Sequence, residues 1–360
     1  MKKTFLYFCL LFIVQTAFAA DSLYVREQQI PILIDRIDNV LYEMRIPAQK
    51  GDVLNEITIQ IGDNVNLSDI QAIRLFYSGV EAPSRKGEHF SPVTYISSHI
   101  PGNTRKALES YSVRQDEVTA PLSRTVKLTS KQPMLKGINY FWVSIQMKPE
   151  TSLLAKVATT IPNAQINNKP IDITWKGKVD ERHVGIGVRQ AGDDGSAAFR
   201  IPGLVTTNNG TLLGVYDIRY NSSVDLQEKI DIGVSRSTDK GQTWEPMRVA
   251  MTFKQTDGLP HGQNGVGDPS ILVDEKTNTI WVVAAWTHGM GNERAWWNSM
   301  PGMTPDETAQ LMLVKSEDDG KTWSEPINIT SQVKDPSWYF LLQGPGRGIT
   351  CLLYTSPSPR

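Results

Sequence analysis

The feature that most constrains the fold of this chain is an octet, Ser-x-Asp-x-Gly-x-Thr-Trp, that occurs twice. Each copy follows a short apolar run and precedes a Glu-Pro pair. In such a pattern the aspartate accepts hydrogen bonds from backbone N–H groups of a turn, the glycine permits a positive φ, and the tryptophan packs beneath the turn. We interpret both copies as structural turns between paired strands and not as catalytic sites. The fixed positions are Ser237, Asp239, Gly241, Thr243 and Trp244 in the first copy and Ser316, Asp318, Gly320, Thr322 and Trp323 in the second.

Repeated hairpins predict repeated small sheets. Four short strands per unit, at a period of ~40–50 residues, are typical of propeller blades. The two copies lie further apart than one such period, and we assign the excess to loops at 255–269 and 288–308, where binding residues are expected. The strands are predicted at 201–207, 211–216, 229–236 and 247–252 in the first unit and at 270–274, 280–286, 311–315 and 327–330 in the second.

Further motifs accompany the octets. Phe199-Arg200-Ile201-Pro202 begins the first unit, Arg219 ends an Asp-x-Arg motif, Asp225 follows it, and Gly267-Asp268-Pro269 begins the second unit. Together with the octets, these motifs resemble the sialidases (neuraminidases) of secreted bacterial type, over about residues 184–350. The octets correspond to that family's Asp-boxes. The resemblance implies an all-β protein in which an N-terminal β-sandwich precedes an incomplete six-bladed β-propeller.

The resemblance also implies roles for individual residues. Arg200 matches one of three arginines that clamp the carboxylate of sialic acid, and a planar guanidinium suits paired hydrogen bonds to a carboxylate. Asp225 matches the residue that protonates the leaving oxygen and then activates water. Arg219 and Asp268 are expected to contact the sugar 4-hydroxyl. Without the motif, Arg200 would be interpreted as a surface ion-pair residue and Asp225 as a solvated loop acid. Asp231 competes with Asp225, but its position within a strand favours a structural role.

Tryptophans and histidines are the other candidates for the site. Trp286, Trp296 and Trp297 either line an apolar pocket for the N-acetyl methyl group or pack in a loop. His261 and His288 have no ligand spacing with other histidine, cysteine or aspartate residues, so no metal is predicted. No cofactor is implied either. Sialidases use tyrosine as the nucleophile, and a neutral phenol would avoid the repulsion that a carboxylate would meet from the anionic substrate.

Residues 1–20 have the pattern of a signal peptide. Lys2 and Lys3 precede an apolar core at 5–14 that is too short to span a bilayer, and Ala17-Phe18-Ala19 suits cleavage. We therefore expect an exported protein (periplasmic, cell-surface or extracellular) without stable membrane insertion. Only Cys351 would remain after cleavage, so no intrachain disulfide is expected.

Residues 21–180 carry no catalytic pattern, but they alternate like β-strands at 29–34, 56–61, 72–77, 126–128 and 140–147. We predict an antiparallel β-sandwich that braces the propeller or binds carbohydrate, with a boundary near 176–183. The net charge of −1 argues against nucleic-acid binding, which usually requires a basic surface. The partners implied by the resemblance are sialylated glycoproteins, glycolipids and oligosaccharides.

The end of the chain departs from the family pattern. The segment 344–349 fits the start of a third blade, but we interpret residues 351–360 as a non-native tail because Ser-Pro-Ser-Pro cannot continue a central strand. Six blades need ~240–300 residues. The nucleophilic tyrosine, its glutamate partner and two clamp arginines are therefore expected outside this chain. The sequence predicts an exo-α-sialidase parent protein and an inactive chain alone; a non-hydrolytic sialic-acid-binding propeller and a trans-sialidase are the alternatives.

Overall fold

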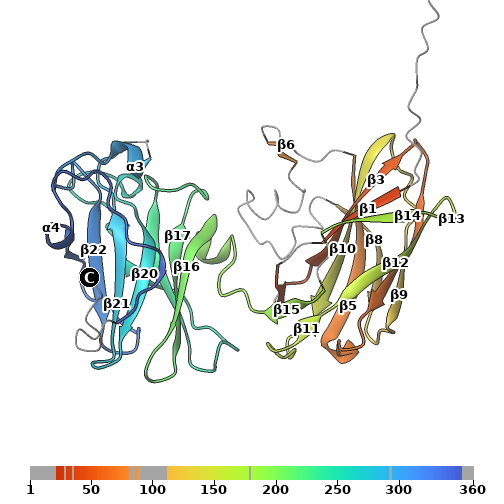
Figure 1. Ribbon diagram of the computed structural model, residues 1–360, viewed down its shortest axis with the longest axis horizontal. Coiled ribbons are helices and arrows are strands. Elements are labelled where there is room, and N and C mark those ends of the chain that lie inside the picture. The colour runs from red at the N-terminus through yellow and green to blue at the C-terminus, as the bar shows by residue number, and fades with distance from the viewer. Residues whose placement is uncertain are drawn as a thin grey trace, which may run out of the picture.

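The computed structural model describes residues 22–27, 30–34, 36–80, 112–177, 180–291 and 294–350, together with the backbone of two short strands, β6 Ser84–Arg85 and β7 Glu88–His89. The predicted signal peptide (1–20), Cys351 and the predicted non-native tail (351–360) lie outside these residues. The described strands form two groups, one from each half of the chain (Figure 1). The prediction of an all-β protein is confirmed.

The N-terminal group is a sandwich of two sheets around one core. Met44, Leu75 and Phe141 from the larger sheet pack in the same buried cluster as Ile57 and Leu128 from the smaller sheet. In spatial order the larger sheet contains β14 Asp172–Lys176, β1 Ser22–Glu27, β3 Asn39–Ala48, β10 Gly137–Met147, β5 Ile70–Gly79 and β8 Val113–Thr119, and the smaller contains β13 Lys169–Pro170, β12 Thr159–Ile166, β4 Leu54–Ile61 and β9 Thr125–Thr129.

The predicted strands at 56–61, 72–77, 126–128 and 140–147 lie within β4, β5, β9 and β10. The predicted strand at 29–34 is only partly described and contains the short β2, Ile32–Leu33. The expectation of a wholly antiparallel sandwich was wrong, because β1 pairs in parallel with β14. These two strands come from opposite ends of the domain, and local alternation carries no information about such a pairing.

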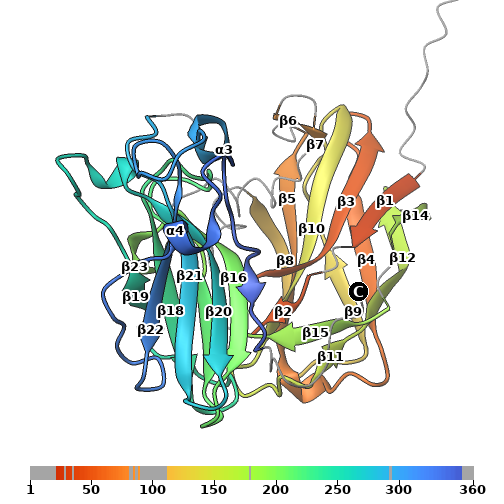
Figure 2. The ribbon, with the colours of Figure 1, turned by 60° about the vertical axis from the view of Figure 1, so that its left-hand side comes forward.

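The segment expected at the domain boundary forms β15, Arg182–Gly185. It pairs in parallel with β2 and antiparallel with β11, Lys156–Val157. Arg182 is buried and donates to the carbonyl oxygens of Val40 at 2.7 Å and Leu41 at 2.6 Å. Residues 184 and 185 were expected in the second domain, but they pair with N-terminal strands. Figure 2 places β2 and β15 on the side of the N-terminal domain that faces the second strand group.

The second group consists of two antiparallel meanders, and each of the eight strands predicted for it overlaps an observed strand. The loop expected at 255–269 is shorter than predicted, because β20 already begins at Val266 and includes Gly267-Asp268-Pro269. The first sheet contains β16 Ala198–Thr206, β17 Leu212–Arg219, β18 Ile230–Ser237 and β19 Arg248–Met251, and the second contains β20 Val266–Asp274, β21 Thr279–Trp286, β22 Gln310–Ser316 and β23 Ile327–Asn328, with β24 Gly346–Arg347 parallel to β20.

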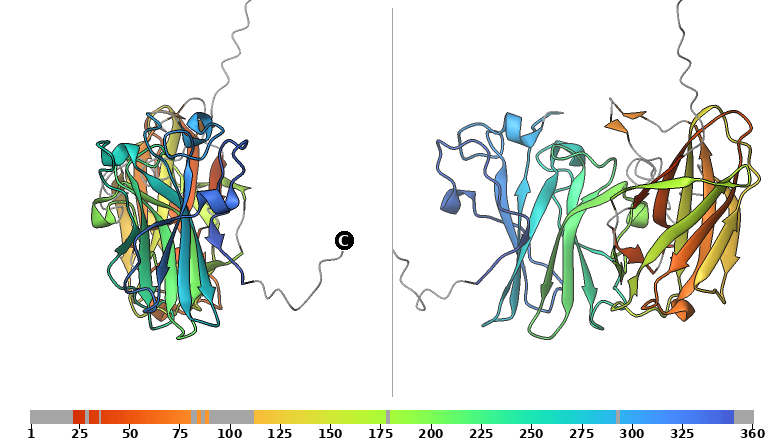
Figure 3. Two further views of the ribbon diagram at one scale, coloured as in Figure 1. Left: turned by 90° about the vertical axis from the view of Figure 1, so that its left-hand side faces the viewer. Right: turned by 45° about the vertical axis from the view of Figure 1, so that its right-hand side comes forward.

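The two meanders share a core, in which Val215 and Val234 of the first sheet pack in one cluster with Ile271 and Val282 of the second. The β16–β19 sheet lies between the N-terminal domain and the β20–β23 sheet (Figure 3, right). β16 and β24 approach closely, because a Cβ added to Gly203 on β16 would lie 2.6 Å from the carbonyl oxygen of Gly346 on β24. Apolar side chains thus fill the space between the two sheets, and β16, β20 and β24 lie next to one another.

The octets form closed turns through their own side chains. In the first copy Ser237 Oγ donates to Asp239 Oδ1 at 2.8 Å, and Thr243 donates to Asp239 from its backbone N–H at 2.9 Å and its hydroxyl at 2.6 Å. The second copy repeats these three bonds among Ser316, Asp318 and Thr322. The bonds from Thr243 lower the pKa of Asp239 to about 2. The turn is therefore fixed within eight residues, as the motif predicts.

Candidate active site

Arg200 lies at an irregular point of β16. Its partner is Asp217, but the next paired residues are Gly203 and Val215, so Ile201 and Pro202 form a bulge. Ile201 has a φ of +56°, which is rare for a β-branched residue and costs conformational energy. β20 has the same break between Gly267 and Ser270, with Asp268 at a φ of +58°. The Arg-Ile-Pro and Gly-Asp-Pro motifs thus begin the first strand of each sheet in the same way.

Two guanidinium groups converge on one carboxylate oxygen. Arg200 Nη1 lies 2.8 Å and Arg219 Nη1 lies 2.7 Å from Asp225 Oδ1. The same two nitrogens each donate to the backbone oxygen of Ser223 at 2.9 Å. The loop that carries Asp225 is therefore held by β16 and β17 together. Arg200 and Asp225 stay accessible, with 42% and 44% of their side chains exposed, whereas Arg219 is 1% exposed.

Asp217 holds Arg219 from the other side and was not predicted as a site residue. Its Oδ2 accepts from Arg219 Nε at 3.1 Å and Nη2 at 2.7 Å, and its Oδ1 accepts the backbone N–H of Asp268 at 2.9 Å. Asp217 therefore connects the two sheets at the site. The Asp-x-Arg spacing was the available signal, because residues i and i+2 of a strand lie on the same face.

The acids of this group differ in their pKa. Burial raises the pKa of Asp225, but hydrogen bonds and charge from Arg219 and then Arg200 outweigh it, so the net pKa is lowered. Burial raises the pKa of Asp217 to about 7, although Arg219 offsets part of the effect. The pKa of Asp268 is also raised, first by burial and then by the charge of Asp225. The site thus places an ionised carboxylate beside two acids that retain protons more readily.

Arg294 and Ala295 contact the loop that carries Asp225. Arg294 Nη1 donates to the Asp225 carbonyl oxygen at 3.1 Å, and the backbone N–H of Ala295 donates to Leu226 O at 3.1 Å. Ala295 is the first residue of the short helix α3, Ala295–Asn298. No motif covers Arg294, so its position at the site could not be predicted from the sequence.

The three tryptophans do not share one environment. Trp286 is buried in the core and stacks on Phe253 with ring centroids 4.4 Å apart, so its ring is packed. Trp296 and Trp297 lie on α3 with exposed fractions of 44% and 70%. Among the described residues no ring contact joins Trp286 to either of them.

Asp231 and the two histidines bond to residues other than Arg200 and Asp225. Asp231 is buried and accepts from Tyr220 Oη at 3.0 Å, and its other oxygen lies 2.8 Å from His261 Nε2. His288 Nδ1 lies 2.7 Å from Asn264 Oδ1. Within the described ranges, no three His, Cys, Asp or Glu side chains are grouped as metal ligands would be, and no helix has the length and apolarity to cross a bilayer.

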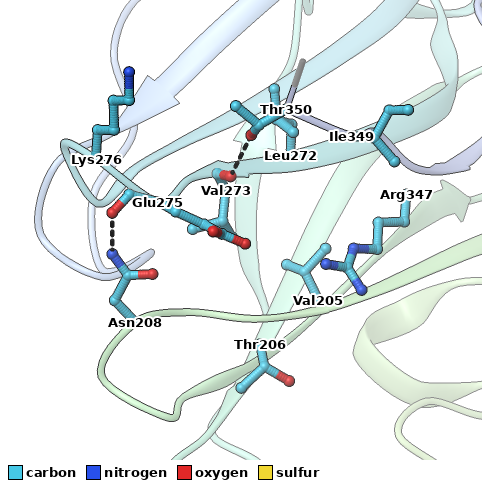
Figure 4. Close-up of a pocket in the computed structure, with 11 residues that line it drawn as sticks. Val205, Thr206, Asn208, Leu272, Val273, Glu275, Lys276, Arg347, Ile349 and Thr350 are labelled. Carbon is cyan, nitrogen blue, oxygen red and sulfur yellow. Dashed lines mark hydrogen bonds between the residues drawn. The ribbon is translucent and has the colours of Figure 1, made fainter. Parts of the chain in front are cut away.

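Two pockets lie near opposite ends of β16. One, of about 460 Å³, is lined by Arg200 and Ser223 and reaches the N-terminal domain at Arg36. The other, of about 360 Å³, is lined by Val205 and Leu272 near the far ends of β16 and β20 (Figure 4). In that second pocket the Asn208 side-chain amide donates to the backbone carbonyl oxygen of Glu275 at 2.8 Å. The second pocket contains neither Arg200, Arg219 nor Asp225. The candidate site therefore lies at the end of β16 that carries Arg200.

Known protein families match both halves of the chain. The N-terminal domain of BNR-repeat neuraminidase matches residues 20–170, and a BNR repeat-like domain matches residues 201–352. A sialidase of Bacteroides fragilis (strain YCH46) is 60% identical over 97% of this chain. A sialidase of Clostridium perfringens is 34% identical over 43% of this chain and 39% of its own length.

Solved structures agree with these matches. The Hadza microbial sialidase Hz136 is 62% identical, with a TM-score of 0.78 over 91% of this chain and 63% of its own. This chain spans 65% of the length of the Bacteroides fragilis sialidase. Family models match both halves of the chain, a sialidase is 60% identical over 97% of the chain, and a solved sialidase shares its fold. The chain belongs to the bacterial sialidase family.

Proposed function

We propose that these residues belong to an exo-α-sialidase that hydrolyses terminal sialic acid from glycoproteins, glycolipids and oligosaccharides. The observation that carries the proposal is the convergence of Arg200 and Arg219 on Asp225 Oδ1, at 2.8 and 2.7 Å. It supports a site in which fixed cations attract an anionic sugar beside an acid. Family membership supports sialidase activity in general, and the assignment of each role below is our proposal.

Arg200 binds the substrate carboxylate in this proposal, because its guanidinium is accessible and positioned by the bulge of β16. Asp225 protonates the leaving oxygen and then takes a proton from water. Arg219, which is buried, and Asp268, at the start of the second sheet, contact the 4-hydroxyl of the sugar. The exposed Trp296 and Trp297 face the N-acetyl group, whereas Trp286 acts through packing.

A general acid must be protonated when the glycosidic bond breaks, yet Arg219 and Arg200 lower the pKa of Asp225 in the free chain. We propose that the substrate itself resolves this conflict. Its carboxylate competes for the N–H groups of Arg200, and Asp225 then loses one of its two charged hydrogen-bond donors. The pKa of Asp225 rises as a result, so the proton becomes available when the sugar is bound.

The nucleophile is proposed to be a tyrosine, with retention of configuration. Two tyrosines near the site make poor candidates. Burial raises the pKa of Tyr216, which shares a hydrogen bond with Ser235 at 2.6 Å, and burial and Asp231 raise that of Tyr220. Both phenols are bonded to residues outside the Arg200–Asp225 pair. We therefore propose that the nucleophile, its glutamate partner and two further arginines come from sequence beyond this chain, which alone does not hydrolyse sialosides.

We also propose a six-bladed propeller for the second domain. Two four-stranded meanders side by side, with their first strands β16 and β20 in contact with each other and with β24, support this arrangement. Six such units need ~240–300 residues. The remaining units would correspond to the part of the Bacteroides fragilis sialidase that this chain does not cover.

Export of the protein remains a proposal. It rests on the basic residues, apolar core and Ala-x-Ala motif within residues 1–20. Sequencing the N-terminus of the mature protein from fractionated cells tests it. We expect a new N-terminus just after Ala17-Phe18-Ala19 in the exported fraction, and an intact Met1 in the cytoplasmic fraction alone would contradict it.

The function is tested with the complete product of the gene. We expect it to release sialic acid from sialyllactose, and Asp225→Ala to lower kcat/KM by about 10²–10⁴-fold, the usual contribution of a positioned acid–base group. Asp306→Ala is the matched control, because its side chain is 86% exposed. Failure of the complete product to release sialic acid, or an unchanged rate in Asp225→Ala, would overturn the proposal. Transfer to added lactose in place of hydrolysis would identify a trans-sialidase.

A further inference from the structure

The loop that carries Asp225 is closed at its base by the residues on either side of it. Tyr220 directly follows β17 and Lys229 directly precedes β18. The backbone N–H of Tyr220 donates to the carbonyl oxygen of Lys229 at 3.3 Å. Between these two residues, the Asp225 carboxylate is held by arginines of β16 and β17. The base of the loop is held by other side chains, to which the proposed mechanism assigns no role.

Asp231, the second residue of β18, is a buried carboxylate that connects this base to a distant segment. Its Oδ2 accepts from Tyr220 Oη at 3.0 Å, and its Oδ1 lies 2.8 Å from His261 Nε2. An ionised carboxylate can only accept, so His261 donates from Nε2 in this pair. Little water competes for these bonds, because the side chains of Asp231 and His261 are 4% and 19% exposed. We call these three residues the Tyr220–Asp231–His261 network.

The short helical turn η4, His261–Gln263, also packs against the loop just after its acid. Gln227 Nε2 donates to the backbone oxygen of Gly262 at 3.1 Å. Gly265 lies so close to the same part of the loop that a Cβ added to it would collide with the backbone oxygen of Glu228. The η4 segment thus supports the half of the loop that follows the acid, and the histidine at its start bonds to β18.

This support gains importance when substrate binds. In the proposed function the substrate carboxylate competes for Arg200, which in the free chain donates to both Ser223 and Asp225. The loop then loses contacts on the side of β16. A general acid must nevertheless stay within hydrogen-bond reach of the oxygen that it protonates. The bonds of Asp231 and η4 involve neither arginine, so they persist when the substrate is bound.

We propose that His261 is a positioning residue for the general acid, because through Asp231 and Tyr220 it fixes the base of the loop that carries Asp225. The inference rests on the proposed sialidase function and extends it to a side chain that does not touch the reacting atoms. The role requires the N–H group at Nε2. Glutamine, whose amide can donate from nearly the same position, should therefore retain most of it.

Leaving-group dependence distinguishes a misplaced acid from a general loss of activity. Lactose leaves sialyllactose only with a proton, whereas 4-nitrophenolate leaves with little help from an acid. In the complete gene product, His261→Ala should lower kcat/KM by about tenfold or more for sialyllactose and by less than about threefold for 4-nitrophenyl sialoside. His261→Gln should restore most of the loss. His183→Ala is the matched control, because that histidine is exposed on β15.

Tyr220→Phe is a second variant of the same network, and it removes a single hydroxyl. It should lower kcat/KM for sialyllactose more than for 4-nitrophenyl sialoside, as His261→Ala does. Since both substitutions act through Asp231, the double variant should lose less than the product of the two single losses. A loss equal to that product would contradict the network. Thermal unfolding checks that each variant is folded.

Equal losses for the two substrates, or an unchanged rate for sialyllactose in folded His261→Ala, would overturn the positioning role. Hydrolysis of neither substrate by the wild type would count against the sialidase function instead. Hydrogen exchange of the 360-residue chain then tests the positioning role without catalysis. In His261→Ala the backbone amides of residues 222–228 should exchange about tenfold faster than in the wild type, while those of β10 stay unchanged. Equal exchange in the two proteins would overturn the proposal.

Discussion

Asp217 and Arg219 form an ion pair in which both side chains are 1% exposed, with 2.7 Å between Asp217 Oδ2 and Arg219 Nη2. The two residues are neighbours on one face of β17, and the second oxygen of Asp217 accepts the backbone N–H of Asp268 on β20. The pair therefore orients Arg219 toward Asp225 and fixes the second sheet relative to the first.

Asp217→Ala should destabilise the chain by about 3 kcal/mol, because the buried Arg219 guanidinium then lacks the carboxylate that pairs with its Nε and Nη2. Urea unfolding of the 360-residue chain at pH 8, where Asp217 is ionised, measures the change. Glu317→Ala is the control: its side chain is 66% exposed and its ion pair with Lys315 should contribute about 0–1 kcal/mol. Equal effects of the two substitutions would mean that the buried pair does not stabilise the fold.

The stability of the chain should fall as pH rises from about 4 to about 7 because of Asp217. Burial raises its folded-state pKa to about 7, above the ~3.9 of an unfolded aspartate. The folded state therefore holds a proton that the unfolded state has released, so the contribution of Asp217 is complete below about pH 4 and lost as pH passes about 7. Urea midpoints at pH 5 and pH 8 should differ less in Asp217→Asn than in the wild type. Identical differences in the two proteins would contradict the assignment.

Arg200→Ala should raise the pKa of Asp225, because it removes one of the two guanidinium groups that outweigh burial there. Carboxyl ¹³C NMR of the chain across a pH series measures this directly. Arg248→Ala is the matched control, since that arginine pairs with Glu245 at 2.8 Å and has no contact with Asp225. If sialic acid binds at Arg200, adding it to the wild type should shift the Asp225 pKa in the same direction. A lowered or unchanged pKa in Arg200→Ala would refute the proposed coupling.

Gly203→Ala should destabilise the second domain by roughly 1–3 kcal/mol, the usual cost of overpacking. Its Cβ would lie 2.6 Å from Gly346 O and 2.9 Å from Val215 Cγ1, and a backbone oxygen cannot easily move away. At Gly344 an added Cβ meets nothing within 4 Å, so Gly344→Ala serves as the control with little expected change. Thermal unfolding of both variants gives the comparison. A tolerant Gly203 would show that β16 and β24 are not packed together.

Local patterns in the sequence determined the repeated hairpins. The octets close within eight residues, through bonds such as that from Thr243 to Asp239, so their geometry needs no distant partner. Strand periodicity in the second half was equally informative, because each strand of a meander pairs with its sequence neighbour. Family motifs supplied Arg200, Arg219 and Asp225, and the structure brings these three together.

Tertiary structure decided the features that depend on residues far apart in the chain. The parallel pairing of β1 with β14, the contact of Arg294 with the Asp225 loop and the burial of Trp286 all join distant segments. The bond between Asp217 and the backbone of Asp268 and the pocket shared by Arg36 and Arg200 are of the same kind. Periodicity and motifs report which residues share a face or a turn, and they carry no record of which faces meet. That information arises only when the sheets pack, because burial and charge pairing are properties of the assembled surfaces.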